Sequence, residues 1–182
     1  MRRINQTDYY VGAFIVSLLN STTGVPALFE ETSDSRKLLI TTNTGNHNLY
    51  IKKSSTGREA IKGKRTKKSF NIPFTEADIT RLQGKFREEG YNNAIALVLS
   101  SEDLNETKIA IIPYDDAMKC LSKKTAGGSR RITVSRYVGE HYFSCYGVGQ
   151  KEEEGVCVYV NHMRYFDEVD GKDNEEEALE IG

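Results

Sequence analysis

Apolar side chains recur at steps of three and four residues near the start of the chain. The spacing from Tyr10 through Phe14 to Leu18 predicts a helix with one apolar stripe that needs a partner surface. Thr7 or Asp8 can cap this helix, and a polar, glycine-containing segment ends it. The chain is therefore expected to open with an amphipathic helix.

Three extended segments follow, and turn residues separate them. They span residues 25–31, 36–42 and 48–54. Because the connections are short, we expect the three strands to pair as an antiparallel meander. A very basic stretch at 55–68 comes next, and we interpret it as a flexible loop.

The next part of the chain contains helices and buried strands. Thr75, with Asp78 three residues later, has the pattern of an N-terminal cap, and we expect a helix at 76–89. The continuous apolar run at 94–99 is typical of a strand that is covered on both faces at the centre of a sheet. The elements expected after it are a strand at 108–113 and a short helix at 114–121.

From residue 130 the periodicity changes to two, which predicts two or three short strands up to residue 160. The predicted fold class is therefore mixed α/β, or α+β. We expect an α/β core over 1–122, a small β appendage over 130–166, and an acidic, disordered tail over 167–182.

Composition is that of an ordinary soluble protein. The 182 residues are 38% hydrophobic and 28% charged, with a formal net charge of -1. No apolar run approaches the ~20 residues that span a bilayer, and no leader pattern marks secretion. Three cysteines without a C-x-x-C pair argue against a disulfide framework. We therefore expect a cytoplasmic protein that does not insert into membranes.

The small net charge hides two opposite patches. Eight basic residues and one acid lie between Lys52 and Lys68, whereas eight acids and one base lie between Asp167 and Gly182. Dense cations can neutralise several phosphates at once, although a solvated loop would show the same pattern. The candidate nucleic-acid-binding residues of the basic stretch are Lys52, Lys53, Arg58, Lys62, Lys64, Arg65, Lys67 and Lys68.

Arginines and aromatic residues alternate in the β appendage. Arg130, Arg131 and Arg136 lie near Tyr137 and Tyr142, with further aromatics downstream. This mixture suits stacking on nucleic-acid bases or packing against a protein partner. An ordinary small β core with its arginines in water is the alternative interpretation. We add the three arginines to the candidate nucleic-acid-binding residues.

Residues 40–55 read Ile-Thr-Thr-Asn-Thr-Gly-Asn-His-Asn-Leu-Tyr-Ile-Lys-Lys-Ser-Ser, and together with the element order this segment resembles the hairpin of PD-(D/E)XK nuclease-like proteins. The resemblance covers about residues 7–121. It implies an acid on one strand and an acid-x-Lys on the next. In that family the acids hold a divalent metal and the lysine assists attack on phosphate.

The resemblance implies Lys52 or Lys53 as the catalytic lysine. The acid position is then Tyr50 or Ile51, and neither side chain offers Mg²⁺ the hard oxygen ligands it prefers. Glu30 and Glu31 are the nearest acids on a strand, and because they point to opposite faces at most one of them belongs to any site; Glu30 is the candidate. We therefore expect an inactive core without a metal or other cofactor, and Mg²⁺ enters only if the protein is an active nuclease.

Two pairs of residues have spacings similar to zinc ligands, His141 with Cys145 and Cys157 with His162. On a strand, Cys157 and His162 would project to opposite faces, so zinc is not expected.

Three functions remain open. The first is a nucleic-acid-associated protein with a degenerate nuclease-like core, in which the basic stretch binds the phosphate backbone of DNA rather than RNA. The second is a protein-interaction subunit of a bacterial or phage-defence assembly, and the third is an active metal-dependent nuclease. A homo-oligomer is compatible with each of them.

Overall fold

The computed structural model describes residues 6–20, 24–31, 35–42, 44–54, 57–100 and 107–167. The elements in chain order are α1 (Gln6–Asn20), β1 (Gly24–Glu31), β2 (Ser35–Thr42), β3 (Gly45–Lys53), β4 (Arg58–Lys62), β5 (Arg65–Phe74), α2 (Glu76–Gln83), β6 (Asn92–Leu99), β7 (Lys108–Pro113), α3 (Tyr114–Cys120), β8 (Arg130–Tyr137), β9 (Tyr142–Gly147), the 3-10 helix η1 (Glu152–Glu154), β10 (Val156–Tyr159) and α4 (Arg164–Asp167). The fold is mixed α+β, as predicted. The expected acidic tail beyond Asp167 lies outside the described residues.

The first sheet, sheet A, has the strand order β1-β2-β3-β6-β7. β1, β2 and β3 form the predicted antiparallel meander, β6 runs parallel to β3, and β7 runs antiparallel to β6. The apolar run at 94–99 becomes β6, whose residues from Ala94 to Leu99 are all buried. This burial confirms the prediction of a central strand that is covered on both faces.

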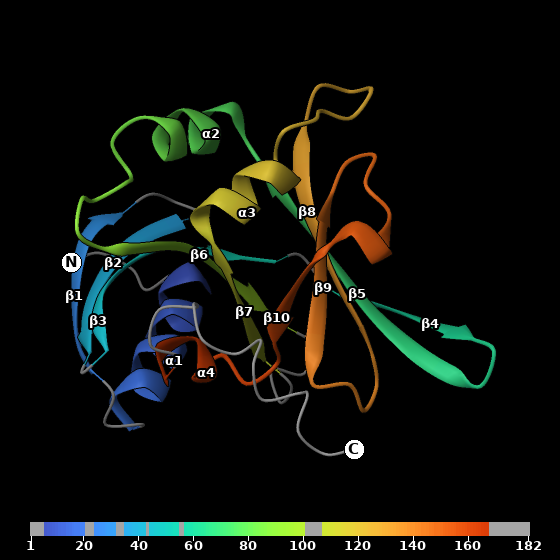
Figure 1. Ribbon diagram of the computed structural model, residues 1–182, viewed down its shortest axis with the longest axis horizontal. Helices are drawn as coiled ribbons and strands as arrows, with labels where there is room; N and C mark the ends of the chain where they lie inside the picture. Colours follow the sequence, from blue (N-terminus) through green and yellow to red (C-terminus); the bar gives the residue numbers. More distant parts are fainter. Residues whose placement is uncertain are drawn as a thin grey trace, which may run out of the picture.

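The two faces of sheet A bury separate hydrophobic clusters. One cluster joins Phe14 and Leu18 of α1 and Phe166 of α4 to Leu49 and Ile51 of β3. The other face packs against α2, α3 and the second sheet. Sheet A is therefore an internal layer, with α1 and α4 on one side of it (Figure 1).

The second sheet, sheet B, has the antiparallel order β10-β9-β8-β5-β4. The prediction of a flexible loop at 55–68 is wrong for the described residues, because this segment supplies β4 and the first four of the ten residues of β5. Phe70, Ile72 and Phe74 alternate inward along β5 and anchor the hairpin to the core.

The β4–β5 hairpin extends away from the rest of the molecule (Figure 1). Gly63 closes its turn with φ +64°, a backbone conformation that glycine adopts without strain. Gly57 precedes β4, and a Cβ there would lie 2.4 Å from the ring of Phe70. The hairpin therefore depends on glycine both at its tip and at its base.

The helix predicted at 76–89 ends earlier than expected, at Gln83. Its N-terminus has the predicted capping box of Thr75 and Asp78. Beyond Gly84 the chain is held by side-chain amides instead: Asn48 donates to the carbonyl of Phe86 at 2.6 Å. The segment after Gly84 is therefore held by a hydrogen bond from β3 and does not continue the helix.

The predicted β appendage corresponds to β8, β9 and β10, and these strands share a sheet with β4 and β5. Ile95 of β6 and Val134 of β8 belong to the same hydrophobic cluster. Residues on both sides of the expected boundary between 122 and 130 therefore build one core. The division into a core over 1–122 and an appendage over 130–166 stays a prediction.

Candidate nucleic-acid interface

Lys52 lies on β3 and points toward the start of α2. Its ammonium is 2.7 Å from Oδ2 of Asp78, and the hydroxyl of Tyr50 donates to Oδ1 of the same carboxylate at 2.6 Å. The backbone N–H and the hydroxyl of Thr75 also donate to Oδ2, at 2.8 and 2.9 Å. The carboxylate therefore accepts four hydrogen bonds.

Burial alone would raise the pKa of the Asp78 carboxyl, but the hydrogen bonds from Lys52, Tyr50 and Thr75 outweigh it and lower that pKa. Asp78 is thus ionised at neutral pH. The side chains of Lys52 and Asp78 are each only 7% exposed. Together they form a buried ion pair that links β3 to α2.

This pair occupies the position where the nuclease resemblance implies a metal site. The arrangement does not fit Mg²⁺, because donors already engage both oxygens of Asp78 and the acid position of the motif is the phenol of Tyr50. Across the part of the chain that the structure describes, no group of three or more His, Cys, Asp or Glu residues could hold a metal ion. We derive no catalytic step from this site.

The other two candidate catalytic residues do not join Lys52. Lys53 is the next residue on β3, so its side chain projects to the opposite face. Glu30 lies on β1, where it pairs with Lys37 of β2, and Lys37 in turn pairs with Tyr50. The backbone of Glu30 is therefore two strand spacings, about 10 Å, from β3.

The basic stretch divides into buried and exposed cations. Lys67 bonds to Glu152 of η1 and is buried, and Lys68 lies 3.0 Å from Glu59. Lys52 and Lys67 are therefore buried and paired with acids, whereas phosphate binding by the basic stretch stays a prediction. The four cations exposed on the hairpin are Arg58, Lys62, Lys64 and Arg65.

Two of the three appendage arginines have intramolecular partners. Arg130 donates to the carbonyl of Leu121 at 2.6 Å. Arg136 donates to the carbonyl of Glu140 at 3.3 Å and lies over the ring of Phe143. Both bonds draw these guanidinium groups toward the protein. Arg131, in contrast, is exposed.

Three tyrosines line up across sheet B. Tyr159 of β10 pairs with Tyr142 of β9, and Ser135 of β8 pairs with Ser144 of β9. Tyr137 is two residues from Ser135 and Tyr142 is two residues from Ser144, so the three tyrosine side chains project from the same face of sheet B. We call these three residues on one face the tyrosine row.

Cations stack at both ends of the tyrosine row. The guanidinium of Arg65 lies 4.3 Å from the ring centroid of Tyr137, and that of Arg164 lies 5.3 Å from the ring centroid of Tyr159. Arg65 belongs to the hairpin and also pairs with Glu140 at 2.6 Å. The basic hairpin and the tyrosine row are therefore continuous on this face of sheet B.

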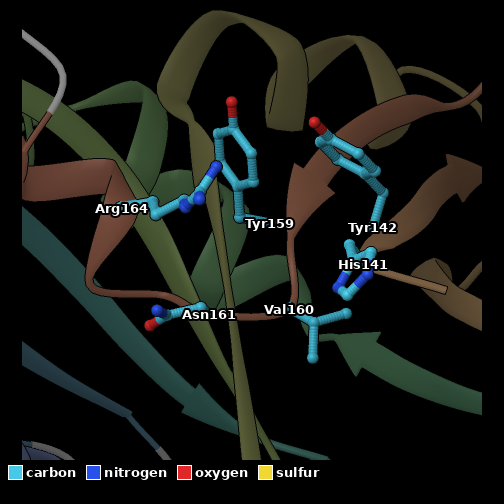
Figure 2. Close-up of a pocket in the computed structure, with 6 residues that line it drawn as sticks. All are labelled: His141, Tyr142, Tyr159, Val160, Asn161 and Arg164. Carbon is cyan, nitrogen blue, oxygen red and sulfur yellow. The ribbon is translucent and has the colours of Figure 1, made fainter. Parts of the chain in front are cut away.

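The far end of the tyrosine row opens into a pocket of about 410 Å³. Figure 2 shows the rings of Tyr142 and Tyr159 pointing the same way, with the side chain of Arg164 reaching toward Tyr159. The described lining residues are His141, Tyr142, Tyr159, Val160, Asn161 and Arg164.

The residues with zinc-like spacing are not brought together. Cys145 is fully buried in the core, whereas His141 is exposed at the pocket. Cys157 is exposed on β10, and His162 is tied to α1 through Ser17.

Sequence reasoning missed two features of this region. The sequence pattern at Thr75 and Asp78 indicates only a helix cap, and it contains no signal that Asp78 also pairs with Lys52. Tyr159 and Arg164 have no signal in the sequence, because the contact between them depends on how α4 follows β10.

Comparison of the chain with family models, with curated proteins and with solved structures found no match. Within the described residues, no helix is long and apolar enough to cross a membrane.

Proposed function

We propose that this protein is a cytoplasmic nucleic-acid-binding protein whose nuclease-like core is not catalytic. The observation that carries the proposal is the hairpin tip, where residues 58–65 are exposed without interruption. This segment has four cations and one acid, a net charge of +3. A solvated ribbon with this charge can neutralise phosphates on a nucleic-acid backbone.

The shape of the hairpin supports DNA as the target. A two-stranded β-ribbon fits the major groove of B-form DNA, whereas the major groove of A-form RNA is too narrow for side chains to read. Ile61 at the tip is 80% exposed, which places an apolar side chain among the cations. Such residues contact thymine methyl groups or base steps in other architectures.

The buried pair of Lys52 and Asp78 supports a non-catalytic core. The ammonium of Lys52 is engaged by a carboxylate and also lies 5.3 Å from the ring centroid of Phe74. This environment holds the lysine away from solvent and from any phosphate. Incubating plasmid DNA and RNA with the protein and Mg²⁺ or Mn²⁺ tests the point, and cleavage by wild type that a folded Lys52→Met variant loses would overturn it.

Binding is tested by fluorescence anisotropy with labelled duplex DNA over a series of salt concentrations. We expect a triple variant, Arg58→Gln, Lys62→Gln and Lys64→Gln, to bind more weakly. The slope of log affinity against log salt should fall in magnitude by about 2 to 3, because each lost phosphate contact removes close to one unit.

A matched control carries the same change of charge elsewhere. Lys85, Lys123 and Lys151 are exposed and lie outside the hairpin, so replacing them by glutamine should leave the slope unchanged. If the two triple variants lost the same DNA affinity, binding would depend only on net charge, which would contradict an interface at the hairpin. Absence of binding by wild type at low salt would overturn the function itself.

One observation favours the second function, a protein-interaction subunit. Tyr9, Val16 and Leu19 share one face of α1, and their side chains are 57, 54 and 54% exposed. Apolar residues gathered on an exposed helix face are a feature of protein interfaces. A stable complex on co-expression with a neighbour-encoded protein, lost in Val16→Glu, would support this function.

A further inference from the structure

The pocket at the end of the tyrosine row provides donors and aromatic surface. Its described lining contains one permanent cation, Arg164, together with imidazole, amide and phenol groups, and no carboxylate. Its volume of about 410 Å³ falls within the range of small-molecule sites. The chemistry of this lining therefore favours an anion that also carries an apolar or planar part.

The two tyrosines are held in place by the backbone. Tyr142 and Tyr159 are paired residues of β9 and β10, and the N–H of Val160 donates to the carbonyl of His141 at 2.9 Å just beyond that pair. The ring centroids are 4.9 Å apart with an interplanar angle of 36°. Tyr142 remains 47% exposed. The pair therefore presents an aromatic surface that is already ordered before a ligand arrives.

The polar wall is built by the turn that leads into α4. Oδ1 of Asn161 accepts from the N–H of Met163 at 3.2 Å, which fixes the side chain and leaves its amide nitrogen as the donor. Arg164 is the first residue of α4, and its guanidinium stacks on Tyr159. In Figure 2 the side chains of Asn161 and Arg164 lie on the same side of the pocket.

We propose that this pocket binds a nucleoside 5′-phosphate, with the base on the tyrosine pair and the phosphate on Arg164 and Asn161. Bases stack on tyrosine whatever their identity, and a guanidinium binds phosphate through two parallel hydrogen bonds. A cationic ligand, which two aromatic rings alone would attract, is opposed by the positive charge of Arg164. The inference rests on the proposed function, because it places one nucleotide of a bound strand on the face of sheet B that also includes Tyr137, which Arg65 of the hairpin contacts.

Isothermal titration calorimetry with AMP, adenosine and inorganic phosphate tests the ligand chemistry. We expect AMP to bind at least about tenfold more tightly than adenosine or phosphate, since only AMP uses both halves of the pocket. Arg164→Gln should remove that advantage, and Arg164→Lys should restore only part of it, because an ammonium lacks the planar fork. Tyr142→Ala should weaken the binding of AMP and of adenosine to the same extent. Lys151→Gln, an exposed cation outside the pocket, serves as the control.

Oligonucleotides distinguish a strand end from a free nucleotide. If the pocket holds a strand end, a 5′-phosphorylated ten-nucleotide DNA binds more tightly than its 5′-hydroxyl counterpart, and Arg164→Gln abolishes the difference. If free nucleotides are the ligand, AMP binds while the two oligonucleotides do not differ. Both outcomes support a nucleoside 5′-phosphate site.

The inference is overturned if AMP does not bind at millimolar concentration and the 5′-phosphate has no effect. The hairpin variant separates this failure from failure of the proposed function. If the triple hairpin variant loses salt-dependent DNA binding and the pocket of the wild type binds no nucleotide, the proposed function is supported and only the nucleotide site is contradicted. Circular dichroism of each variant verifies that it is folded.

Discussion

The ammonium of Lys52 and the carboxylate of Asp78 form an ion pair 2.7 Å long, with both side chains only 7% exposed. Asp78 also closes the capping box of α2 with Thr75. One carboxylate therefore caps the N-terminus of α2, neutralises a buried lysine and accepts a hydrogen bond from the hydroxyl of Tyr50. In the structure these residues connect β3 to α2.

Breaking this pair from one side should be strongly destabilising. We expect Lys52→Met to lower the free energy of unfolding by about 3 to 5 kcal/mol, because it leaves the charge of Asp78 buried without its cation. Adding Asp78→Asn should recover part of the loss, and urea denaturation of the single and double variants measures it. Lys119→Met removes an exposed pair with Asp116 and should have little effect. Similar losses at the two positions would contradict the buried pair.

Lowering the pH should decrease the free energy of unfolding, in part because Asp78 becomes protonated. Its folded-state pKa lies below the ordinary value of 3.8, so its contribution to stability is complete above that pH and is lost as the pH falls through the folded-state pKa. In Asp78→Asn the contribution is absent at every pH. Urea midpoints between pH 6 and pH 2 should therefore decline less steeply in the variant than in wild type, and parallel curves would contradict this assignment.

His162 should destabilise the fold at mildly acidic pH. Burial, with a smaller effect of the nearby charge of Lys108, lowers the pKa of its ring from 6.5 to about 4. Since the unfolded chain takes up the proton first, stability should fall as the pH drops from about 6.5 toward 4. The ring packs against Phe14 and lies 3.3 Å from Oγ of Ser17, so α1 should loosen first.

The His162 prediction is checked by hydrogen exchange of α1 amides at pH 7 and pH 5. Wild type should lose protection in α1 at the lower pH. His162→Gln should show no such change with pH, whatever its overall stability. A ring that titrates near pH 6.5 by NMR would contradict the expectation.

Gly147 should tolerate no side chain. A Cβ at this residue would lie 1.7 Å from the carbonyl oxygen of Cys120, which is backbone and cannot rotate away. We expect Gly147→Ala to cost about 3 kcal/mol or to prevent folding. Gly127→Ala is the matched control: its nearest neighbour is the Thr125 hydroxyl at 3.9 Å, so the change should stay within about 0.5 kcal/mol. Thermal denaturation of both variants compares them directly.

Local patterns predicted most of the framework. The stripe of α1, the capping box at Thr75 and the apolar run of β6 each depend on residues within one element, so their signals survive in the sequence. The β4–β5 hairpin escaped prediction, because its tip is exposed on both faces and has no apolar alternation to detect. The shorter α2 escaped as well, because Asn48 holds the following segment from 38 residues away.

The candidate site was predicted only in part. Composition identifies Arg58, Lys62 and Lys64 as part of a dense basic stretch, but their exposure to solvent is seen only in the structure. The alignment of Tyr137 with Tyr142 and Tyr159 depends on the register of three strands, and no pattern within one strand contains that register.

The amino-acid sequence by itself determined most of the helices and strands outside the β4–β5 hairpin and where charge is concentrated, because periodicity, capping and composition are local properties. Only the tertiary structure decided which charges reach solvent. Lys52 and Lys67 are as basic as Lys62 and Lys64, yet the packing of α2 and η1 brings Asp78 and Glu152 against the first two, whereas the other two are exposed. The partner of a charged side chain is set by contacts between distant elements, and these exist only after the sheets have packed.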